Sequence, residues 1–553
     1  MLAIEPTASE SSRQEPFRWT RAETVDAVEN FDHSNHPSQR AYAQQHGIPH
    51  ATFNYWMRHH HSVVSDPVDS FFRSPAGELV LRQIVLAALV TFQLQGACGI
   101  RLVGTFLDRA GLDRFVASSR GALQPLAAGV EADLVAFRDA EQPPLAEQME
   151  FKTVTLIVDE HFHAVKPCLV AMEPVSGFLV VECYRDNRAA DTWTAAIHEG
   201  TVGMHIQVVL LTSDLAKALL CCAEKNLQVQ HSPDLFHGQQ DLLQPLLLPL
   251  ARPIQQAKKD LEKAQKRSDK LDGPMDEPMS EEDWLVLIEA ARAEQAVAAR
   301  LEQAQQFKEE AVQQVRGLGD DYHPFDRETG KPLAAEEVGK RLAGHLDQLA
   351  KVVTEAGLGG RAEQAVNKSR TWVATLTGVV AWFWGLATAR VEELDLSEEQ
   401  ERAVYEKLLP GYYWAMAAGR ARTSEERTRL KELAESLTKE AWQKGGALAA
   451  LSPEERKEVE EVARESAGLF QRSSSCVEGR NGRLSLQHHG HSRVREGRLR
   501  ALTVIHNYLL KRADGTTAAQ RFFGRPHKDL FAWLLERMPD LPRPAKKRRH
   551  AAA

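Results

Sequence analysis

The chain has 553 residues, of which 43% are hydrophobic and 26% are charged, and its net charge is −8. This length is typical of several domains, and the composition is that of a globular chain with sizeable cores, which excludes a fibrous or largely disordered protein. The six cysteines show no C-x-x-C spacing and the N-terminus is polar, so we expect no disulfide framework, no cysteine zinc site and no signal peptide, and a cytoplasmic protein with reduced thiols.

The net charge is unevenly distributed along the chain. From Gln471 to the end there are 18 Lys or Arg against 6 Asp or Glu, a charge of +12, so the remaining residues carry −20. A basic segment on an acidic chain indicates a polyanionic partner for that segment, although a solvated basic face would have the same composition.

The N-terminal part predicts a small helical unit. Residues 1–37 are polar, and we expect them to be disordered or loose. Residues 38–62 are typical of a helix-turn-helix, with Ala43 small where two helices would touch and Gly47 at the turn. The side chains that would pack the second helix onto the first are Ile48, Phe53 and Trp56.

The second helix of this unit would present polar side chains to a DNA major groove. They are His50, Thr52, Asn54, Tyr55 and Arg58. A packed helical hairpin without DNA contact is the alternative. Residues 63–148 have apolar residues at helical spacing, and we expect a helical linker or a second DNA-binding unit there, with the linker favoured.

Two apolar runs further along predict buried strands. The run 153–158 consists of Val, Leu, Ile and Thr and is followed directly by Asp159, and the run 206–211 is followed three residues later by Asp214. Two strands that end in Asp would place two carboxylates side by side, where they could hold Mg²⁺ or Mn²⁺. Either Asp could instead be a strand-end cap, and Glu160 could replace its neighbour as a ligand.

The residues around these two runs complete the order strand-strand-strand-helix-strand-helix. The further elements that we expect are strands at 164–172 and 178–184, helices at 189–199 and 215–225, and a short strand at 227–230. This order predicts a mixed sheet with helices, and therefore an α/β domain, in a chain whose other parts are all α-helical.

Residues 245–470 are rich in Glu, Lys, Ala and Gln and predict a helical domain. Amphipathic stretches at 254–270 and 284–316 indicate an antiparallel helical hairpin or weak coiled coil, with the bend at 272–278. We expect Gly and Pro breaks at 317–331, 357–360 and 410–411. The second stretch has Leu, Ala and Val at heptad spacing, namely at Leu287, Ala290, Val297, Leu301, Ala304, Ala311 and Val315, with Glu294 and Lys308 on the same seam.

One run in this domain has nearly the length that spans a bilayer. Thr371–Ala389 contains 19 residues without a charge. It also contains four Thr and two Gly and stands alone in a polar helical region. We therefore expect a buried core helix and no membrane span.

The segment after residue 470 combines serines, an acid and basic residues. Ser473, Ser474 and Ser475 would cap a helix on which Glu478 and Asn481 share one face. The residues of this segment that we expect to contact DNA are Arg480, Asn481, Arg493, Arg495 and Arg498, with a solvated face as the alternative for each arginine. An amphipathic helix at 499–510 and a basic tail follow.

Asp159, Asp214 and Glu478 together resemble the acidic triad of the DDE transposases of bacterial insertion sequences, which have a ribonuclease-H-like fold. The predicted strand order is similar to that fold. The 263 residues between Asp214 and Glu478 are similar to the helical insertion domain that several transposase groups carry at this point. Asp234 and His237 stand in the D-x-x-H spacing that such transposases carry, and we interpret them as a structural pair. Glu465 and Glu496 are alternatives for the Glu.

The resemblance implies a domain order and a reaction. The expected domains are a helix-turn-helix at 38–62, a ribonuclease-H-like catalytic core at 149–244 and 471–535, a helical insertion domain at 245–470 and a basic tail at 536–553. It implies Mg²⁺- or Mn²⁺-dependent cleavage and strand transfer of double-stranded DNA by a homodimer in the bacterial nucleoid. The alternatives are a DNA-binding regulator or domesticated, inactive derivative, and a structural helical protein.

Overall fold

The computed structural model describes residues 19, 21–32, 38–63, 67–163, 166–271, 280–490 and 494–544. Contacts divide the chain into two compact units. The terminal unit comprises Met1–Gln142, Ser485–Leu510 and Pro526–Ala553, and the central unit comprises Pro143–Leu484 and Lys511–Arg525. The expectation that residues 1–37 are loose is wrong for Arg21–Asp32, which form helix α1. The rest of that segment, except Trp19, and residues 545–553 of the basic tail lie outside the described residues.

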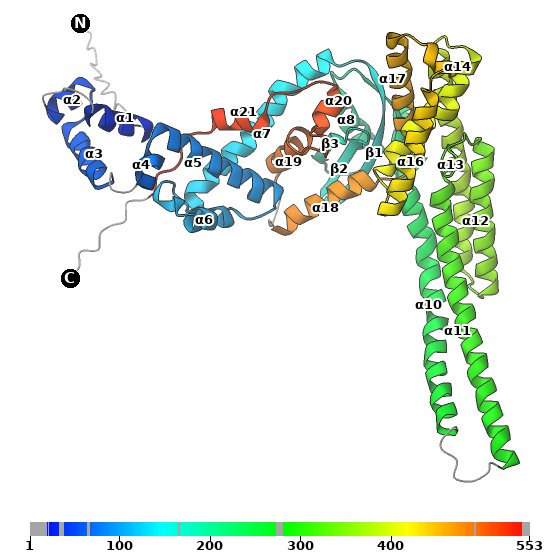
Figure 1. Cartoon of the computed structure of the whole chain (residues 1–553). Helices are drawn as coiled ribbons and strands as arrows, with labels where there is room; N and C mark the ends of the chain where they lie inside the picture. The colour runs from blue at the N-terminus through cyan, green and yellow to red at the C-terminus, as the bar shows by residue number, and fades with distance from the viewer. Residues whose placement is uncertain are drawn as a thin grey trace, which may run out of the picture. The chain divides into compact units, whose positions relative to one another are not determined.

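The terminal unit begins with three short helices around an aromatic core. They are α1 (Arg21–Asp32), α2 (Gln39–Gln45) and α3 (His50–Val63) (Figure 1). The Ser38 hydroxyl accepts a hydrogen bond from the Ala41 backbone N–H and caps α2, while Gly47 has a φ of +66° in the turn before α3. Ala43, Ile48 and Phe53 are buried, as the sequence predicts, and Trp56 packs against them partly exposed.

Further helices complete the terminal unit. Their bounds are α4 (Pro67–Arg73), α5 (Pro75–Ala88) continuing as the π-helix η1 (Leu89–Gln95), α6 (Ile100–Arg109), η2 (Leu112–Arg114), the first part of α7 (Arg120–Gln148), α19 (Glu496–Tyr508) and α21 (Leu530–Arg537). The helical character of 63–148 is thereby confirmed, and the break after η1 occurs at Gly96–Gly99.

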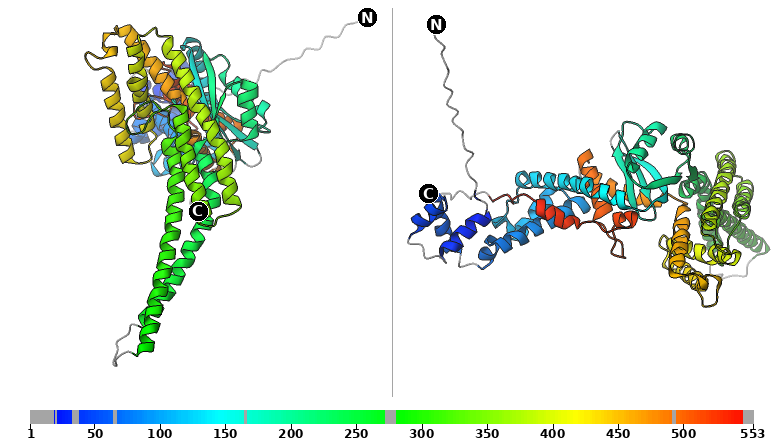
Figure 2. Two further views of the ribbon diagram at one scale, coloured as in Figure 1. Left: turned by 90° about the vertical axis from the view of Figure 1, so that its right-hand side faces the viewer. Right: turned by 90° about the horizontal axis from the view of Figure 1, so that it is seen from above.

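The central unit contains a five-stranded mixed sheet in the order β3-β2-β1-β4-β5. The strands are β1 (Lys152–His163), β2 (Lys166–Glu173), β3 (Phe178–Tyr184), β4 (Ile206–Ser213) and β5 (Gln230–Pro233) (Figure 2). β1 runs antiparallel to β2 and parallel to β4, which also runs parallel to β5. The predicted mixed sheet is confirmed, with β5 three residues later than expected.

The prediction that the first strand ends at Asp159 is wrong. β1 pairs with β2 as far as His163↔Lys166, whereas its pairing with β4 stops at Ile157↔Thr212. Asp159 therefore lies inside β1, at the point where one neighbouring strand has ended and the other continues. β2, the antiparallel hairpin partner of β1, continues to pair with it after the apolar run 153–158 has ended. This pairing extends β1 beyond the residues that composition alone predicts as a strand.

One face of the sheet is covered by α8 (Ala190–Thr201) and by α9 (Lys217–Cys221) with η3 (Cys222–Leu227). Trp193 and Ile197 of α8 and Cys222 of η3 are buried against the strand residues Leu156 and Leu211. Burial of these apolar side chains is the main stabilising contribution to this layer and fixes the positions of β1 and β4.

Two long helices leave the sheet and form an antiparallel hairpin, α10 (Leu235–Leu271) and α11 (Glu281–Asp321) (Figures 1 and 2). The expected seam is confirmed, because its members are half-buried or buried while most of their neighbours are exposed. The expected bend at 272–278 lies outside the described residues. Our expected start of α10 at residue 254 is wrong: Pro245, Pro249 and Pro253 lie inside the helix, spaced four residues apart, while Leu242, Leu246 and Leu250 are buried.

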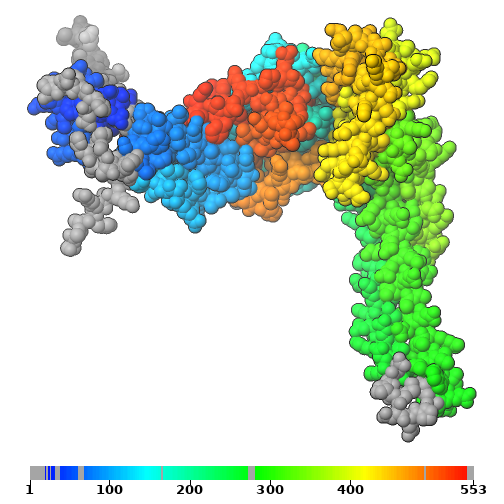
Figure 3. All heavy atoms as spheres, viewed as in Figure 1, coloured from blue at the N-terminus to red at the C-terminus, as the bar shows by residue number. Residues whose placement is uncertain are grey.

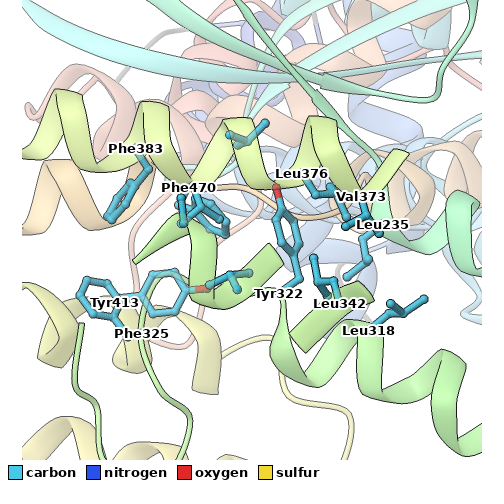
Figure 4. Close-up of a cluster of buried hydrophobic side chains, with 14 of the residues drawn as sticks. Leu235, Leu318, Tyr322, Phe325, Leu342, Val373, Leu376, Phe383, Tyr413 and Phe470 are labelled. Carbon is cyan, nitrogen blue, oxygen red and sulfur yellow. The ribbon is translucent and has the colours of Figure 1, made fainter. Parts of the chain in front are cut away.

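The helices that follow α11 as far as residue 469 pack around the base of this hairpin. They are α12 (Ala335–Glu355), α13 (Arg361–Glu392), α14 (Glu398–Ala403), η4 (Val404–Leu408), α15 (Leu409–Ala418), α16 (Ser424–Ala441), η5 (Ala447–Ala450) and α17 (Pro453–Leu469). Figure 4 shows part of their shared core, to which α10, α11, α12, α13 and α15 contribute. The expected break at 357–360 is confirmed, whereas Pro410 and Gly411 lie inside the first turn of α15.

The uncharged run 371–389 lies in α13. Trp372, Leu376, Val380 and Phe383 face the helical core, and the exposed positions of the run are Thr, Ala and Gly. The prediction of a core helix is thus confirmed for the apolar face. By length and composition alone, two helical stretches among the described residues, Pro75–Gln95 and Arg361–Glu392, are long and apolar enough to cross a membrane.

Candidate functional site

The sheet places Asp159 in β1 and Asp214 directly after the end of β4, the neighbouring parallel strand. The last paired residues of β1 and β4 are Ile157 and Thr212, and each acid follows its paired residue by two positions. Asp214 accepts a hydrogen bond on its Oδ1 from the Ala216 backbone N–H, so it also caps the turn before α9. The two carboxylates are close enough for the charge of Asp214 to raise the pKa of Asp159.

Glu478 lies on α18 (Ser475–Gly490), the helix that the serines were expected to cap. Its Oε1 lies 3.9 Å from Nδ1 of His237 and 3.3 Å from Oγ of Ser474. The charges of Glu478 and Asp159 both act on His237. The imidazole of His237 therefore interacts with both Asp159 of β1 and Glu478 of α18.

Asp234 connects the end of β5 to the start of α18. Its Oδ2 accepts hydrogen bonds from His237 Nδ1 at 2.8 Å, from the Ser474 backbone N–H at 3.0 Å and from the Ser474 hydroxyl. Its Oδ1 accepts a hydrogen bond from the Phe236 backbone N–H at 2.7 Å. The carboxylate is fully buried, so Asp234 and His237 form the expected pair, and this pair holds the helix of Glu478 against the sheet.

A buried ion pair provides a second attachment of α18. The guanidinium of Arg480 donates from Nε and Nη2 to the two carboxylate oxygens of Glu182 on β3, at 2.7 and 2.6 Å. Both side chains are almost completely buried. The expectation that Arg480 contacts a DNA phosphate is therefore wrong for this structure, because its donors are used inside the protein and a buried charge left without its partner is costly.

Asn481 lies beside the first acid. Its Nδ2 donates to Oδ2 of Asp159 at 2.8 Å, and the side chain also interacts with His161 on β1. Asn481 and Glu478 are three residues apart and approach the site from the same face of α18, as the sequence predicts. The amide of Asn481 thus fixes the orientation of the Asp159 carboxylate. The expected contact of Asn481 with DNA stays a prediction.

Glu160, the alternative ligand, is occupied by an ion pair with Arg188. The carboxylate is buried, whereas 56% of the Arg188 side chain is exposed. The charge of Asp214 also acts on Arg188. Arg188 therefore places a positive charge at the outer edge of the acidic cluster.

The ionisation of the cluster follows from its burial. Burial, together with the negative charges of Glu160 and Asp214, raises the pKa of Asp159 to about 7. The hydrogen bond to Asp234 and the charges of Asp234, Glu478 and Asp159 raise the pKa of His237 to about 9. His237 is consequently an imidazolium at neutral pH and compensates part of the negative charge.

Two sets of residues are possible metal ligands. Among the described residues, the set whose ligand atoms all lie within 4.8 Å of one another is Asp234, His237 and Glu478. Asp234 already accepts five hydrogen bonds, including one from Nδ1 of His237, which argues against this set. Asp159, Asp214 and Glu478 supply only carboxylate oxygens, the donors that Mg²⁺ and Mn²⁺ prefer, and Asp159 carries a buried charge that a cation would compensate.

The chain matches one family model over residues 404–550, and that family is described only as a family of unknown function (DUF6399). The matched part contains Glu478, Arg480 and Asn481 and excludes Asp159 and Asp214. It covers about a quarter of the chain, so it is a similarity and assigns no function. No curated protein and no solved structure matches the chain.

The other predicted DNA-contacting residues lie in the terminal unit. On α3, Tyr55 and Arg58 are exposed, while Thr52 and Asn54 are half-buried. Arg495 is exposed at the start of α19, and Arg493 lies outside the described residues. The expectation for Arg498 is wrong, because its guanidinium is buried and donates to the Glu131 carboxylate at 2.8 Å and to the Gln93 backbone carbonyl.

Sequence reasoning missed several residues around the acids. His161 and Arg188 contact the site, and Glu182 holds Arg480. Ser474 was expected only as a helix cap, and its hydroxyl donates to Asp234. A detectable signal existed for Glu182, since a single acid within the apolar strand FLVVECY requires a buried partner. His161 and Arg188 stand in polar sequence that gives no comparable indication.

Replacement of Ser474 tests the attachment of α18. Ser474→Ala removes one hydroxyl hydrogen bond to the buried Asp234 and should lower the free energy of unfolding by about 1–2 kcal/mol. Ser475→Ala is the matched control, because Ser475 is exposed and its loss should change stability by less than about 0.5 kcal/mol. Urea denaturation measures both, and equal effects of the two substitutions would contradict the attachment.

The raised pKa of Asp159 predicts a pH-dependent effect of Asp159→Asn in protein without divalent cations. The ionised carboxylate costs stability in the folded state as the pH rises from about 4, its unfolded pKa, to about 7. The variant should therefore gain melting temperature relative to the wild type between pH 4 and pH 7, by roughly 2–4 °C for each kcal/mol that burial of the charge costs.

Thermal denaturation in a chelating buffer measures this difference. Asp241→Asn is the control, because Asp241 is 71% exposed and carries no burial cost. A constant difference between Asp159→Asn and wild type across this pH range would show that the Asp159 carboxylate is not buried as a charge.

Proposed function

We propose that the chain is a metal-dependent DNA-cleaving and strand-transferring enzyme of the DDE transposase type, with a ribonuclease-H-like core. The observation that carries the proposal is the placement of Asp159 in β1 and of Asp214 directly after β4, the adjacent parallel strand. Glu478 of a late helix lies 3.9 Å from His237, whose charge also acts on Asp159. The strand order β3-β2-β1-β4-β5, with the first three strands antiparallel, supports the same fold. The residues 245–470 interrupt this core as an insertion domain would.

In this proposal Asp159 and Asp214 hold Mg²⁺ or Mn²⁺ and Glu478 completes the site. The bound cations would activate the attacking oxygen and stabilise the leaving oxygen of a phosphodiester. Asn481 fixes the orientation of the Asp159 carboxylate through its hydrogen bond of 2.8 Å. Arg188 attracts the phosphate, and His237 balances the negative charge of the acids before the cation enters.

The terminal unit would bind the DNA ends in this proposal. α3 carries the exposed Tyr55 and Arg58 on a helix that follows a tight turn, a geometry that suits insertion in a major groove. Arg495, which is exposed, would contact a phosphate. We infer a homodimer on double-stranded DNA in the bacterial nucleoid, because a transposase must hold two ends at once.

Neutral isosteres of the three acids test the catalytic proposal. Asp159→Asn, Asp214→Asn and Glu478→Gln should each reduce Mg²⁺-dependent nicking of DNA that carries the flanking sequences of the gene by at least about 10³-fold, because each removes a metal-binding charge. Asp214→Asn retains the side-chain oxygen that accepts the hydrogen bond from the Ala216 backbone N–H, so this variant should keep the wild-type fold.

Glu160→Gln provides the discriminating control for these variants. Glu160 is adjacent to Asp159 and pairs with Arg188, so its loss should leave most of the nicking activity. Loss of activity in Glu160→Gln together with full activity in Asp159→Asn would refute the ligand assignment. Gel-shift binding without any Mg²⁺-dependent cleavage by the wild type would favour the alternative, a DNA-binding regulator.

Arg58→Ala tests the role of α3. Loss of one exposed cation that contacts DNA should weaken binding of the flanking DNA by about 10-fold at moderate salt and lower the salt dependence of binding. Arg101→Ala, which removes an exposed arginine from α6 of the same unit, is the control and should bind as the wild type does. Gel-shift titration at two salt concentrations measures both, and equal affinities of the two variants would exclude α3 from the DNA interface.

A further inference from the structure

The far end of the α10–α11 hairpin exposes an unusual group of apolar side chains. Trp284, Leu285, Val286 and Ile288 are exposed by 52%, 60%, 40% and 40%. Ser280 and Asp283 form a capping box, so the group lies in the first two turns of α11. Exposed clusters of large apolar residues mark surfaces that bind a partner.

The sequence explains why one neighbouring helix cannot cover this group. Residues 284–288 are five consecutive apolar residues, which extend more than once around a helix at 3.6 residues per turn. α10 covers the side of Leu287, which is half-buried on the hairpin seam, and leaves the other sides open. Figure 3 shows the surface of the hairpin away from α14–α17, where α10 and α11 extend beyond the other helices of the unit.

The charges beside this apolar group differ between the two helices. The last turns of α10 carry four exposed cations, Lys263, Lys266, Arg267 and Lys270, and one exposed acid, Asp269. The first turns of α11 carry the exposed acids Glu281, Glu282, Asp283 and Glu289. Because the hairpin is antiparallel, the basic and the acidic segments lie at the same end. The acidic turns would repel DNA and the anionic surface of a membrane.

We propose that the hairpin tip, defined as Lys263–Leu271 and Glu281–Glu289, binds the tip of a second copy of this chain. A two-fold interface requires a self-complementary surface, and here the basic α10 segment of each copy would lie against the acidic α11 segment of the other around a shared apolar centre. Four apolar side chains are fewer than a standard interface of about 800 Å² per partner contains, so the charged segments contribute to the affinity. This inference does not rest on the catalytic proposal.

Substitution of a single tip residue in the full-length protein tests the apolar centre. Without DNA, sedimentation velocity at micromolar concentration should give twice the mass of one chain for the wild type. Leu285→Ser should weaken dimerisation by at least about tenfold, because it removes a central apolar contact. Leu248→Ser is the matched control, because Leu248 is 61% exposed on the same hairpin outside the tip, and this variant should dimerise as the wild type does.

A charge exchange tests the identity of the occupant. Lys263→Glu, Arg267→Glu and Lys270→Glu in one chain make both of its tip segments acidic. Glu281→Lys, Glu282→Lys and Glu289→Lys in another chain make both of its tip segments basic. Each variant should be monomeric alone at low salt, and an equimolar mixture should form a heterodimer, because only the mixed pair has opposite charges on both sides.

Three results would overturn the proposal. The first is a wild-type monomer at all concentrations, including one that sediments with phosphatidylcholine–phosphatidylglycerol vesicles, which would assign the tip to a membrane. The second is a Leu285→Ser variant that dimerises as tightly as the wild type. The third is a mixture of the charge variants that stays monomeric while circular dichroism shows both to be folded.

Discussion

The buried carboxylate of Asp234 is the contact on which the candidate site depends. It joins β5 to Ser474 across 240 residues of sequence, and it does so beside the start of the helix that carries Glu478. Backbone hydrogen bonds extend the same junction, from Asp234 N–H to the Ser213 carbonyl and from Leu235 N–H to the Arg472 carbonyl. The helical domain between these points therefore leaves the sheet and returns to it at one place, which keeps the acids of the two segments together.

The return of the chain to the sheet beside Asp234 brings several charged groups into one site. Asp159, Asp214, Asp234 and Glu478 are gathered in a partly buried region, and the neighbouring positive groups are His237 and the guanidinium of Arg188. Such a cluster costs stability unless a cation compensates it, a cost that is common at functional sites. In the protein alone, the imidazolium of His237 supplies part of this compensation, which explains why its pKa lies so far above the usual value.

Local patterns predicted the strands and the main helices, because apolar runs and heptad spacing are properties of neighbouring residues. The strand order followed from the alternation of elements, and the two aspartates followed from their position after apolar runs. Burial of polar groups was not predictable in this way. Arg480 and Arg498 resemble surface arginines in sequence, and only the distant Glu182 and Glu131 reveal that both are internal. The continuation of β1 past Asp159 likewise depends on β2, and the unbroken α10 depends on packing that tolerates three prolines.

The most direct test of the central claim is anomalous diffraction from crystals of the full-length protein soaked in Mn²⁺. The account predicts an anomalous peak among the carboxylates of Asp159, Asp214 and Glu478, with His237 outside the coordination sphere. A peak held by Asp234 and His237, or the absence of any peak near Asp159 at saturating Mn²⁺, would contradict it.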